Sequence, residues 1–166
     1  MYMRSMESGR IVPDAEPTVI QDNGTAIVMD GNFSHGIYTC LKGTELAIER
    51  AKETGMCGVT FKQIDHIGRL GHYVEMAGRA GCVGFVTVGW GEADKGNVLP
   101  HGSNTATFNT NPIAFGIPTG DDTPYVLDYA NSVVAEGKLR VAKSKEMDVT
   151  PGTIVDKNRK PTLSPL

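Results

Sequence analysis

The chain has 166 residues, enough for one domain of ordinary size that buries a real core. Its 40% hydrophobic and 21% charged residues are typical of a globular protein. The formal net charge is −3, and because Lys and Arg are scattered along the chain, we expect no nucleic-acid partner. Cys40, Cys57 and Cys82 are an odd number without a CxxC pair. This excludes a disulfide framework or zinc knuckle and favours a reducing cytoplasm.

The first 17 residues predict the tail of a helix followed by an extended lead-in. Gly9 interrupts the helical pattern, and Pro13 and Pro17 prevent the helix from resuming. No signal-peptide core is present, and no run of 18 apolar residues occurs. We therefore expect no contact with a membrane.

A hairpin and a long helix follow. Two β-rich runs, 18–21 and 25–30, flank Asp22-Asn23-Gly24, whose residues tolerate the left-handed conformation of a tight turn. From 36 to 54, apolar or small residues recur at helical spacing, and Gly55 stands where a helix-terminating glycine is expected.

The next segment predicts a β-α-β unit. An apolar strand over 56–61 is followed by a loop, a helix over about 71–80, Gly81 as its terminator and a strand over 83–88. Because a helix between two strands normally makes a parallel crossover, we expect these two strands to pair in parallel.

His66 lies in the glycine-bracketed loop between the first of these strands and the helix. In open α/β sheets, ligands bind beyond the carboxyl ends of strands, and the next helix offers unpaired N–H groups to an anion such as a substrate carboxylate. The alternative is a histidine that only satisfies a loop hydrogen bond. His35, His72 and His101 are too dispersed to predict a metal site.

The glycine-rich loop at 89–102 does not have the dinucleotide fingerprint. Gly89-Trp90-Gly91 begins like GxGxxG after a strand, but Asp94 stands at the third glycine position. A Rossmann phosphate loop is therefore not expected. Loops of this length within compact domains are more often functional than structural filler.

Two later segments have both a functional and a structural interpretation. The run 109–118 is either a rigid loop lining a ligand pocket or an Asx-turn before a buried strand. A strand over 125–127 ends at Asp128, whose carboxylate either accepts ribose hydroxyls or caps the next helix. That helix is expected over 132–145, capped by Asn131 or Ser132.

Together these segments resemble the malate/L-lactate dehydrogenase family of the second type, which also holds ureidoglycolate, sulfolactate and piperideine-2-carboxylate reductase-like enzymes. The order and spacing of the following motifs support the resemblance: SGRIVPDAEP at 8–17, DGN at 30–32, HIGRLGHYVEMA at 66–77, the Pro-x-Gly loop at 100–102, TNPIAFGIP at 110–118, VLDYANS at 126–132, GK at 137–138, VDKN at 155–158 and PT at 161–162. The resemblance implies an α/β fold with a mixed sheet and flanking helices, and a non-Rossmann site for NAD or NADP.

The resemblance also assigns roles to individual residues. The catalytic proton acceptor of the family's His-x-Gly motif falls on His66. Cofactor-binding and pocket-lining positions fall on Trp90, Pro100, Gly102, Thr110, Asn111, Pro112, Asp128, Tyr129 and Ala130. Departures from the family pattern are Ser103, Asn109 and Asn131, together with a longer loop after Trp90.

The resemblance covers only the central, cofactor-binding portion of a member, with residues 1–17 as a remnant of the preceding helical segment. An upstream Ser-His-Gly segment and a C-terminal portion have no counterpart, and His35 in Ser34-His35-Gly36 is not taken as the missing histidine. We expect a homodimeric oxidoreductase that transfers a hydride between NAD or NADP and a small 2-hydroxy or 2-oxo acid, and we expect the isolated chain to be inactive. The alternatives are a non-catalytic fragment that retains the fold centre and dimer interface, and a binding module unrelated to dehydrogenases.

Overall fold

The computed structural model describes residues 2–89 and 96–165. The chain divides into two compact units: unit 1 comprises residues 1–86 and 114–128, and unit 2 comprises residues 87–113 and 129–166. Each unit is described by itself.

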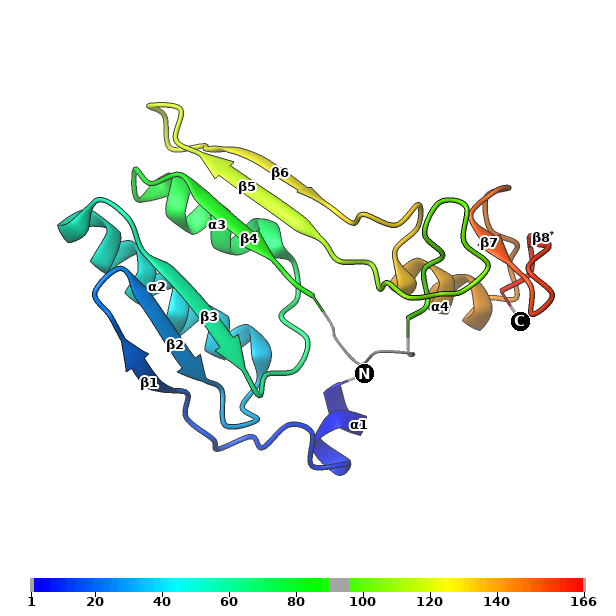
Figure 1. Cartoon of the computed structure of the whole chain (residues 1–166), viewed down its shortest axis with the longest axis horizontal. Coiled ribbons are helices and arrows are strands. Elements are labelled where there is room, and N and C mark those ends of the chain that lie inside the picture. Colours follow the sequence, from blue (N-terminus) through cyan, green and yellow to red (C-terminus); the bar gives the residue numbers. More distant parts are fainter. Residues whose placement is uncertain (1, 90–95, 166) are drawn as a thin grey trace. The chain divides into compact units, whose positions relative to one another are not determined.

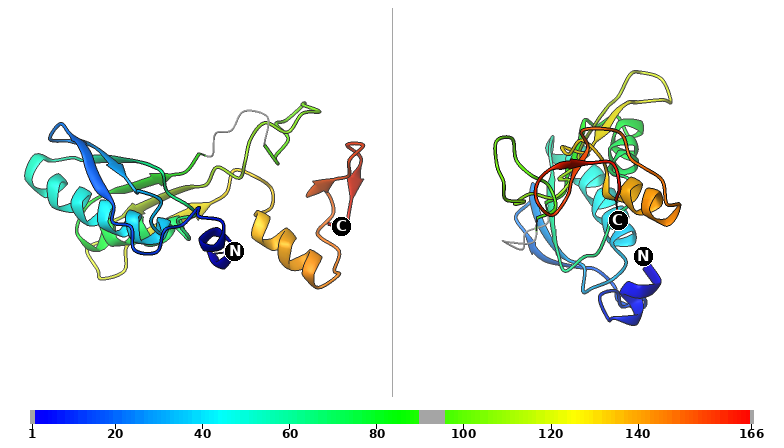
Figure 2. Two further views of the ribbon diagram at one scale, coloured as in Figure 1. Left: turned by 90° about the horizontal axis from the view of Figure 1, so that it is seen from below. Right: turned by 90° about the vertical axis from the view of Figure 1, so that its right-hand side faces the viewer.

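The first half of unit 1 is a mixed three-stranded sheet with a long helix. Its elements are α1 (Tyr2–Glu7), β1 (Thr18–Asp22), β2 (Ala26–Asp30), α2 (Gly36–Thr54) and β3 (Gly58–Lys62). The strand order is β1-β2-β3; β1 pairs antiparallel with β2, and β2 pairs parallel with β3. Helix α2 connects the parallel pair and lies along one face of the sheet (Figures 1 and 2). The predicted hairpin and helix are confirmed.

The hairpin and α2 are joined by local chemistry that the sequence contains. Gly24 has a φ of 81°, and its N–H donates to Asp22 Oδ1 at 2.9 Å, which closes the turn. Arg50 of α2 donates to both carboxylate oxygens of Asp22, each at 2.9 Å. This bidentate bond lowers the pKa of the Asp22 carboxyl. Gly55, with a φ of 89°, ends the helix.

The second half of unit 1 packs helix α3 against another sheet. Its elements are α3 (Leu70–Arg79), β4 (Gly84–Thr87), β5 (Ile113–Ile117) and β6 (Tyr125–Tyr129), of which Thr87, Ile113 and Tyr129 belong to unit 2. The strand order is β4-β5-β6 (Figure 1). Val74 of α3 is fully buried, and Ala114 of β5 is equally inaccessible. The expected mixed α/β fold with flanking helices is confirmed.

The predicted parallel pairing of the strands at 56–61 and 83–88 is wrong. β3 pairs with β2, whereas β4 lies beside β5 in the other sheet. The crossover helix that generates the parallel pair is α2, not α3. Helix α3 packs closely on the sheet that contains β4. A Cβ on Gly84 would come within 3.0 Å of Val74 Cα, so the glycine permits this close approach.

Unit 2 contains α4 (Glu136–Ser144), β7 (Ile154–Val155) and β8 (Pro161–Thr162). β7 and β8 pair antiparallel, and a single bridge joins Val98 to Phe108. The helix predicted over 132–145 begins only at 136, and neither predicted cap acts as one. The Asn131 amide bonds instead to the Asn111 carbonyl, and Ser132 Oγ donates to the Val134 carbonyl.

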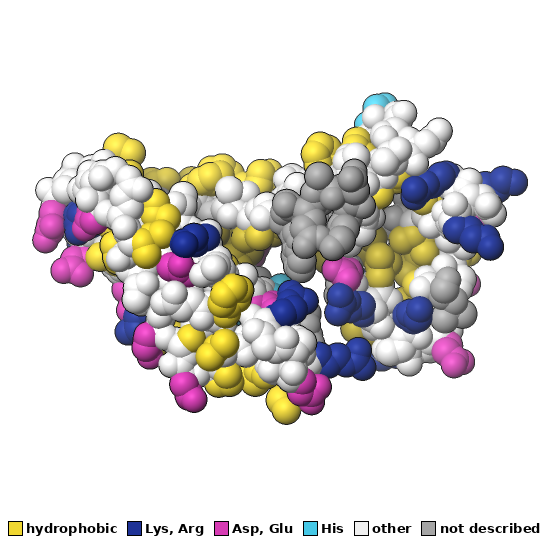
Figure 3. Space-filling model, turned by 60° about the horizontal axis from the view of Figure 1, so that its bottom comes forward, with side chains coloured by type: hydrophobic (Ala, Val, Ile, Leu, Met, Phe, Trp, Pro, Cys, Tyr) yellow, Lys and Arg dark blue, Asp and Glu magenta, His cyan; other side chains and the backbone are white. Residues whose placement is uncertain are grey.

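On the face drawn in Figure 3, Lys and Arg side chains and Asp and Glu side chains both occur, with hydrophobic side chains between them. Among the helices that the structure describes, none is both long and apolar enough to cross a bilayer.

Asp30 should make the fold sensitive to acid. Its carboxylate lies 2.8 Å from Lys62 Nζ and accepts the Asn32 N–H at 2.8 Å, and the bond to Lys62 is the main reason that its pKa lies below the usual 3.8. Because the folded pKa is depressed, the stabilisation is present above about pH 4 and is lost as the pH falls through the folded pKa. Asp30→Asn should therefore flatten the decline of the melting temperature between about pH 4 and pH 2. The exposed Asp121→Asn serves as control, and equal slopes in both variants would contradict the assignment.

Candidate active site

His66 is exposed on the loop between β3 and α3. Its backbone N–H donates to Asp65 Oδ1, and the Gly68 N–H donates to its Nδ1 at 3.2 Å. Because a backbone N–H can only donate, Nδ1 must act as an acceptor, and the neutral ring then carries its proton on Nε2. The loop thereby selects one tautomer of His66.

A hydroxyl group approaches the same nitrogen. Tyr2 of α1 places its Oη 2.8 Å from His66 Nδ1, and its ring lies 5.9 Å from the His66 ring and 4.6 Å from the His35 ring, centroid to centroid. His35 in turn accepts the Ile37 N–H at 3.3 Å and so caps α2. Sequence reasoning missed Tyr2 and gave His35 no role, because the packing of α1 joins residues 64 positions apart.

The His66 loop is held from several sides. Tyr73 of α3 is 2% exposed and donates its hydroxyl to the Ile67 carbonyl, and burial raises the pKa of Tyr73. The side chain of Asp65 is 5% exposed and pairs with Arg10 at 3.3 Å. A Cβ on Gly36, the first residue of α2, would lie 2.2 Å from the Asp65 carbonyl oxygen. The loop is therefore fixed by contacts with both helices and with the segment after α1.

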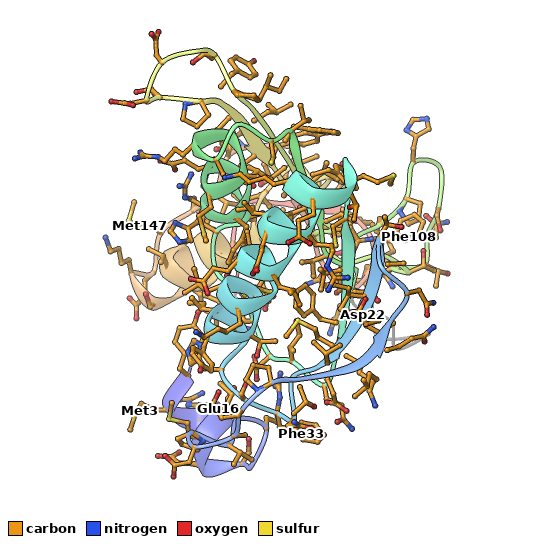
Figure 4. The ribbon with its side chains drawn as sticks, turned by 90° about the vertical axis from the view of Figure 1, so that its left-hand side faces the viewer. Met3, Glu16, Asp22, Phe33, Phe108 and Met147 are labelled. Atoms are coloured by element: carbon orange, nitrogen blue, oxygen red, sulfur yellow. The ribbon has the colours of Figure 1, made fainter. Side chains whose placement is uncertain are left out.

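A small cavity of about 230 Å³ lies beside this loop. It is lined by Ser8, Gly9, Arg10, Phe33, Gln63, Ile64 and Asp65. Phe33, labelled in Figure 4, is 46% exposed and has a φ of 60°, and Gln63 has a φ of 52°. These conformations are uncommon for residues other than glycine. His66 is not among the lining residues, so the cavity adjoins the candidate base without containing it.

Asp128 lies within β6 rather than at the strand end, because β6 continues to Tyr129. Its Oδ2 accepts the Gly71 N–H at 2.7 Å, in the first turn of α3. The sequence left open whether Asp128 binds ribose hydroxyls or caps the helix that follows it. Asp128 does cap a helix, but that helix is α3 and not the following one. Because the His66 loop leads directly into α3, His66 and Asp128 both lie at the N-terminal end of this helix.

In unit 2, the structure brings two predicted segments together. The Asn131 N–H donates to the Thr110 carbonyl at 2.9 Å, and its side-chain amide donates to the Asn111 carbonyl at 2.6 Å. Tyr129 and Ala130 directly precede Asn131 in the chain, so within unit 2 they lie close to Thr110 and Asn111. Asn111 has a φ of 34°, and its Oδ1 is buried without a hydrogen-bond partner in the described residues.

The other predicted cofactor-binding residues that the structure describes lie in a turn or at a strand end. The Pro112 carbonyl accepts the Thr87 hydroxyl at 3.1 Å, which ties the end of β4 to the start of β5. Pro100 begins a turn closed by the Ser103 N–H at 3.0 Å, with Gly102 at a φ of 76°. Trp90 lies outside the described residues.

Comparisons with known proteins identify the family of this chain. The malate/L-lactate dehydrogenase family profile matches residues 1–166, and the chain belongs to this family. Hydroxycarboxylate dehydrogenase B of Escherichia coli O157:H7 is 34% identical over 166 residues, covering 99% of this chain and 45% of that protein. L-sulfolactate dehydrogenase of Methanocaldococcus jannaschii is 30% identical over 164 residues, covering 99% of this chain and 46% of that protein.

A solved structure has the same fold over the matched region. Malate dehydrogenase from Entamoeba histolytica superposes with a TM-score of 0.88 at 30% identity, covering 99% of this chain and 44% of that one. The chain therefore spans slightly less than half the length of the relatives that it matches.

Proposed function

We propose that this chain forms part of an NAD- or NADP-dependent oxidoreductase that interconverts a small 2-hydroxy acid and its 2-oxo acid. The observation that supports it best is the hydroxyl of Tyr2 at 2.8 Å from His66 Nδ1, in a chain that belongs to the malate/L-lactate dehydrogenase family. The Tyr2 hydroxyl shows that an O–H donor reaches this nitrogen, and a substrate hydroxyl in its place would lie within the hydrogen-bond distance that a general base needs.

His66 is the proposed general base. Nδ1 holds the lone pair of the neutral ring, and the Gly68 N–H and the Tyr2 hydroxyl both lie against it, so a substrate hydroxyl would take the place of the Tyr2 hydroxyl. During oxidation, the proton of the substrate hydroxyl passes to this nitrogen; during reduction, it returns from it. Histidine is the side chain that most often serves as a general acid and base, and one imidazole nitrogen can serve both directions of the reaction.

The residues of this chain suit a dinucleotide at two places, one in each unit. In unit 1, the Asp128 carboxylate is exposed beside the first turn of α3, where a ribose hydroxyl can donate to it. In unit 2, the buried Oδ1 of Asn111 has no hydrogen-bond partner among the described residues, and a hydroxyl or amide of the cofactor is the proposed donor. When bound, the nicotinamide supplies or accepts the hydride at C2 of the substrate.

The second candidate is a non-catalytic polypeptide that retains the fold centre and a dimer interface. The chain spans 45% of the length of the Escherichia coli relative, and this candidate applies if no further segment completes the site. We propose a homodimer in either case. We also propose a reducing cytoplasmic location, since Cys40, Cys57 and Cys82 are an odd number of cysteines without a CxxC pair.

Cofactor binding separates the two candidates. Titration of the 166-residue chain with NADH and with NADPH, followed by nucleotide fluorescence, should show saturable binding of at least one of them, while turnover of 2-oxo acids by the chain alone should be absent. Saturable binding supports the oxidoreductase. If neither nucleotide binds to a folded sample, the non-catalytic alternative is favoured.

Asp128→Ala should raise the dinucleotide Kd at least about tenfold, equivalent to about 1.4 kcal/mol, because a charge-assisted hydrogen bond is lost. It should also lower the stability by about 1 kcal/mol, because the Gly71 N–H loses its acceptor. Asp128→Asn is the matched control, since its amide oxygen can still accept the Gly71 N–H while the charge is removed. A normal Kd in the folded Asp128→Ala protein, together with a lower melting temperature, would leave Asp128 with the cap alone.

A further inference from the structure

The turn between β1 and β2 contains the single Asn-Gly pair of the sequence, Asn23-Gly24. Asn23 is exposed to solvent. A Cβ on Gly24 would meet nothing within 4 Å, so the space beside the Gly24 Cα is open. Because Gly24 has no side chain, nothing of its own hinders an approach of its backbone nitrogen to the side-chain amide of Asn23. The pair therefore has the composition and exposure that favour attack on the asparagine side chain by the next backbone nitrogen.

This attack exchanges one amide for another, and hydrolysis follows. The Gly24 nitrogen bonds to Cγ of Asn23, the bond from Cγ to the side-chain nitrogen breaks, and ammonia leaves with the proton of the Gly24 N–H. Water then opens the cyclic imide on one side or the other of its nitrogen. The product is either aspartate or isoaspartate, in which the backbone runs through the side-chain carbons. The reaction consumes only water, and no group is oxidised or reduced.

Hydrogen bonds of the folded turn oppose the attack. The Gly24 N–H donates to Oδ1 of Asp22, labelled in Figure 4, at 2.9 Å, so the attacking nitrogen is already engaged. Arg50 of α2 holds both carboxylate oxygens of Asp22 at 2.9 Å, and its Nη1 also donates to the Gly24 carbonyl at 2.7 Å. The peptide groups on both sides of Gly24 are therefore held, one of them through a bidentate bond of specific geometry.

The charge of Asp22 acts in the same direction. Attack requires the Gly24 nitrogen to lose its proton, and a carboxylate beside it disfavours a second negative charge at this place. The bond to Arg50 lowers the pKa of the Asp22 carboxyl, so the carboxylate stays ionised at neutral pH. In the closed turn, Asn23 is therefore protected by both position and charge.

The protection is reversible because the turn lies at the surface. The side chains of Asp22 and Arg50 are 40% and 23% exposed, respectively. Hydrogen bonds at such positions open more readily than those of a buried core. Since Asn23 reacts while the turn is open, the rate of the reaction follows the fraction of time for which Arg50 has let go.

We propose that Asn23 is a site of spontaneous deamidation and that the bonds from Arg50 to Asp22 and Gly24 set its rate. The inference goes beyond the proposed reaction of the enzyme and is independent of the role of His66.

The modification should affect the hairpin. The Asn23 N–H donates to the Ala26 carbonyl at 2.9 Å, and the pairing of β1 with β2 continues up to Asp22 and Ile27. An isoaspartate lengthens the backbone within this turn, so the register that the turn fixes cannot be kept there. Chains that carry isoaspartate should therefore melt at a lower temperature than unmodified chains.

The test follows the tryptic peptide of residues 11–42 by liquid chromatography and mass spectrometry while the folded chain is incubated at neutral pH. The peptide also contains Asn32 as an internal control, because Asn32 precedes Phe33 and donates its side-chain amide to the Glu16 carbonyl at 2.8 Å. We expect the mass gained when NH₂ is replaced by OH to appear at Asn23 and not at Asn32. The same chain unfolded in urea should react at Asn23 about threefold faster or more, because no turn protects it.

Variants of α2 test the role of Arg50. Arg50→Ala should raise the rate at Asn23 about threefold or more, because the turn opens more often. Arg50→Lys keeps the charge without the bidentate bond and should give an intermediate rate. Lys52→Ala, at an exposed position of the same helix, is the control. None of these changes alters the peptide that is measured, and circular dichroism establishes that each variant is folded.

Faster modification of Asn23 in folded Arg50→Ala than in Lys52→Ala supports the inference. Failure of Asn23 to react in both the folded and the unfolded chain overturns it, since the site would not exist. Equal rates in the folded and unfolded wild-type chain also overturn it, and this comparison holds even if Arg50→Ala does not fold. Equal rates in folded Arg50→Ala and Lys52→Ala would contradict control by Arg50.

Discussion

Replacing His66 with Asn should lower the maximal rate of 2-hydroxy acid oxidation about 100-fold or more, the usual contribution of a general base. Asn cannot accept a proton at neutral pH, but it is close to His in size and can still accept the Gly68 N–H that now reaches Nδ1. The loop should therefore keep its shape, and the dinucleotide Kd should change little. Because the isolated chain is expected to be inactive, the rate is measured in a chimera in which these 166 residues replace the matching region of Escherichia coli hydroxycarboxylate dehydrogenase B.

The matched control is His72→Asn. His72 is exposed on α3, only a few residues along the chain, and makes an edge contact with the Tyr73 ring at 5.6 Å. It should leave the rate of the chimera nearly unchanged. Wild-type turnover in the His66→Asn chimera would remove His66 from the mechanism, and equal losses in both variants would indicate a general effect on α3.

Gly116→Ala should cause the largest loss of stability. A Cβ at this position in β5 would lie 2.1 Å from the Val74 carbonyl oxygen and 2.9 Å from Val74 Cβ. Neither the helix backbone nor the sheet can move away without opening the core around the fully buried Val74. Overpacking of this kind costs about 3 kcal/mol, and more where backbone must shift. Urea unfolding followed by circular dichroism measures the change.

Gly58→Ala is the corresponding control in a strand. Its Cβ would meet only the Thr25 carbonyl oxygen, at 4.0 Å, which is ordinary contact. We expect no loss of stability, or a gain of up to about 1 kcal/mol from the reduced entropy of the unfolded chain. If Gly116→Ala is as stable as Gly58→Ala, α3 does not pack on β5 as described.

Local features were predictable where neighbouring residues decide the conformation. The turn at Asp22-Asn23-Gly24 and the helix at 36–54 followed from residues that act within a few positions of themselves, and both were confirmed. The helix predicted over 132–145 was wrong at its start because Asn131 bonds to Asn111, 20 residues away. A side chain engaged over such a distance cannot serve as the local cap that its residue type favours.

The sequence by itself determined the family, since the order and spacing of its motifs are specific, and it determined that His66 follows a strand and precedes a helix. Only the tertiary structure decided which strands pair, which helix Asp128 caps and which hydroxyl meets His66. The physical reason is that each of these depends on two segments far apart in the chain. Gly71 and Asp128 are separated by 57 positions, and Tyr2 and His66 by 64. Periodicity and propensity report what one segment favours, whereas the partner of a buried face or a hydrogen-bonding group is selected by packing.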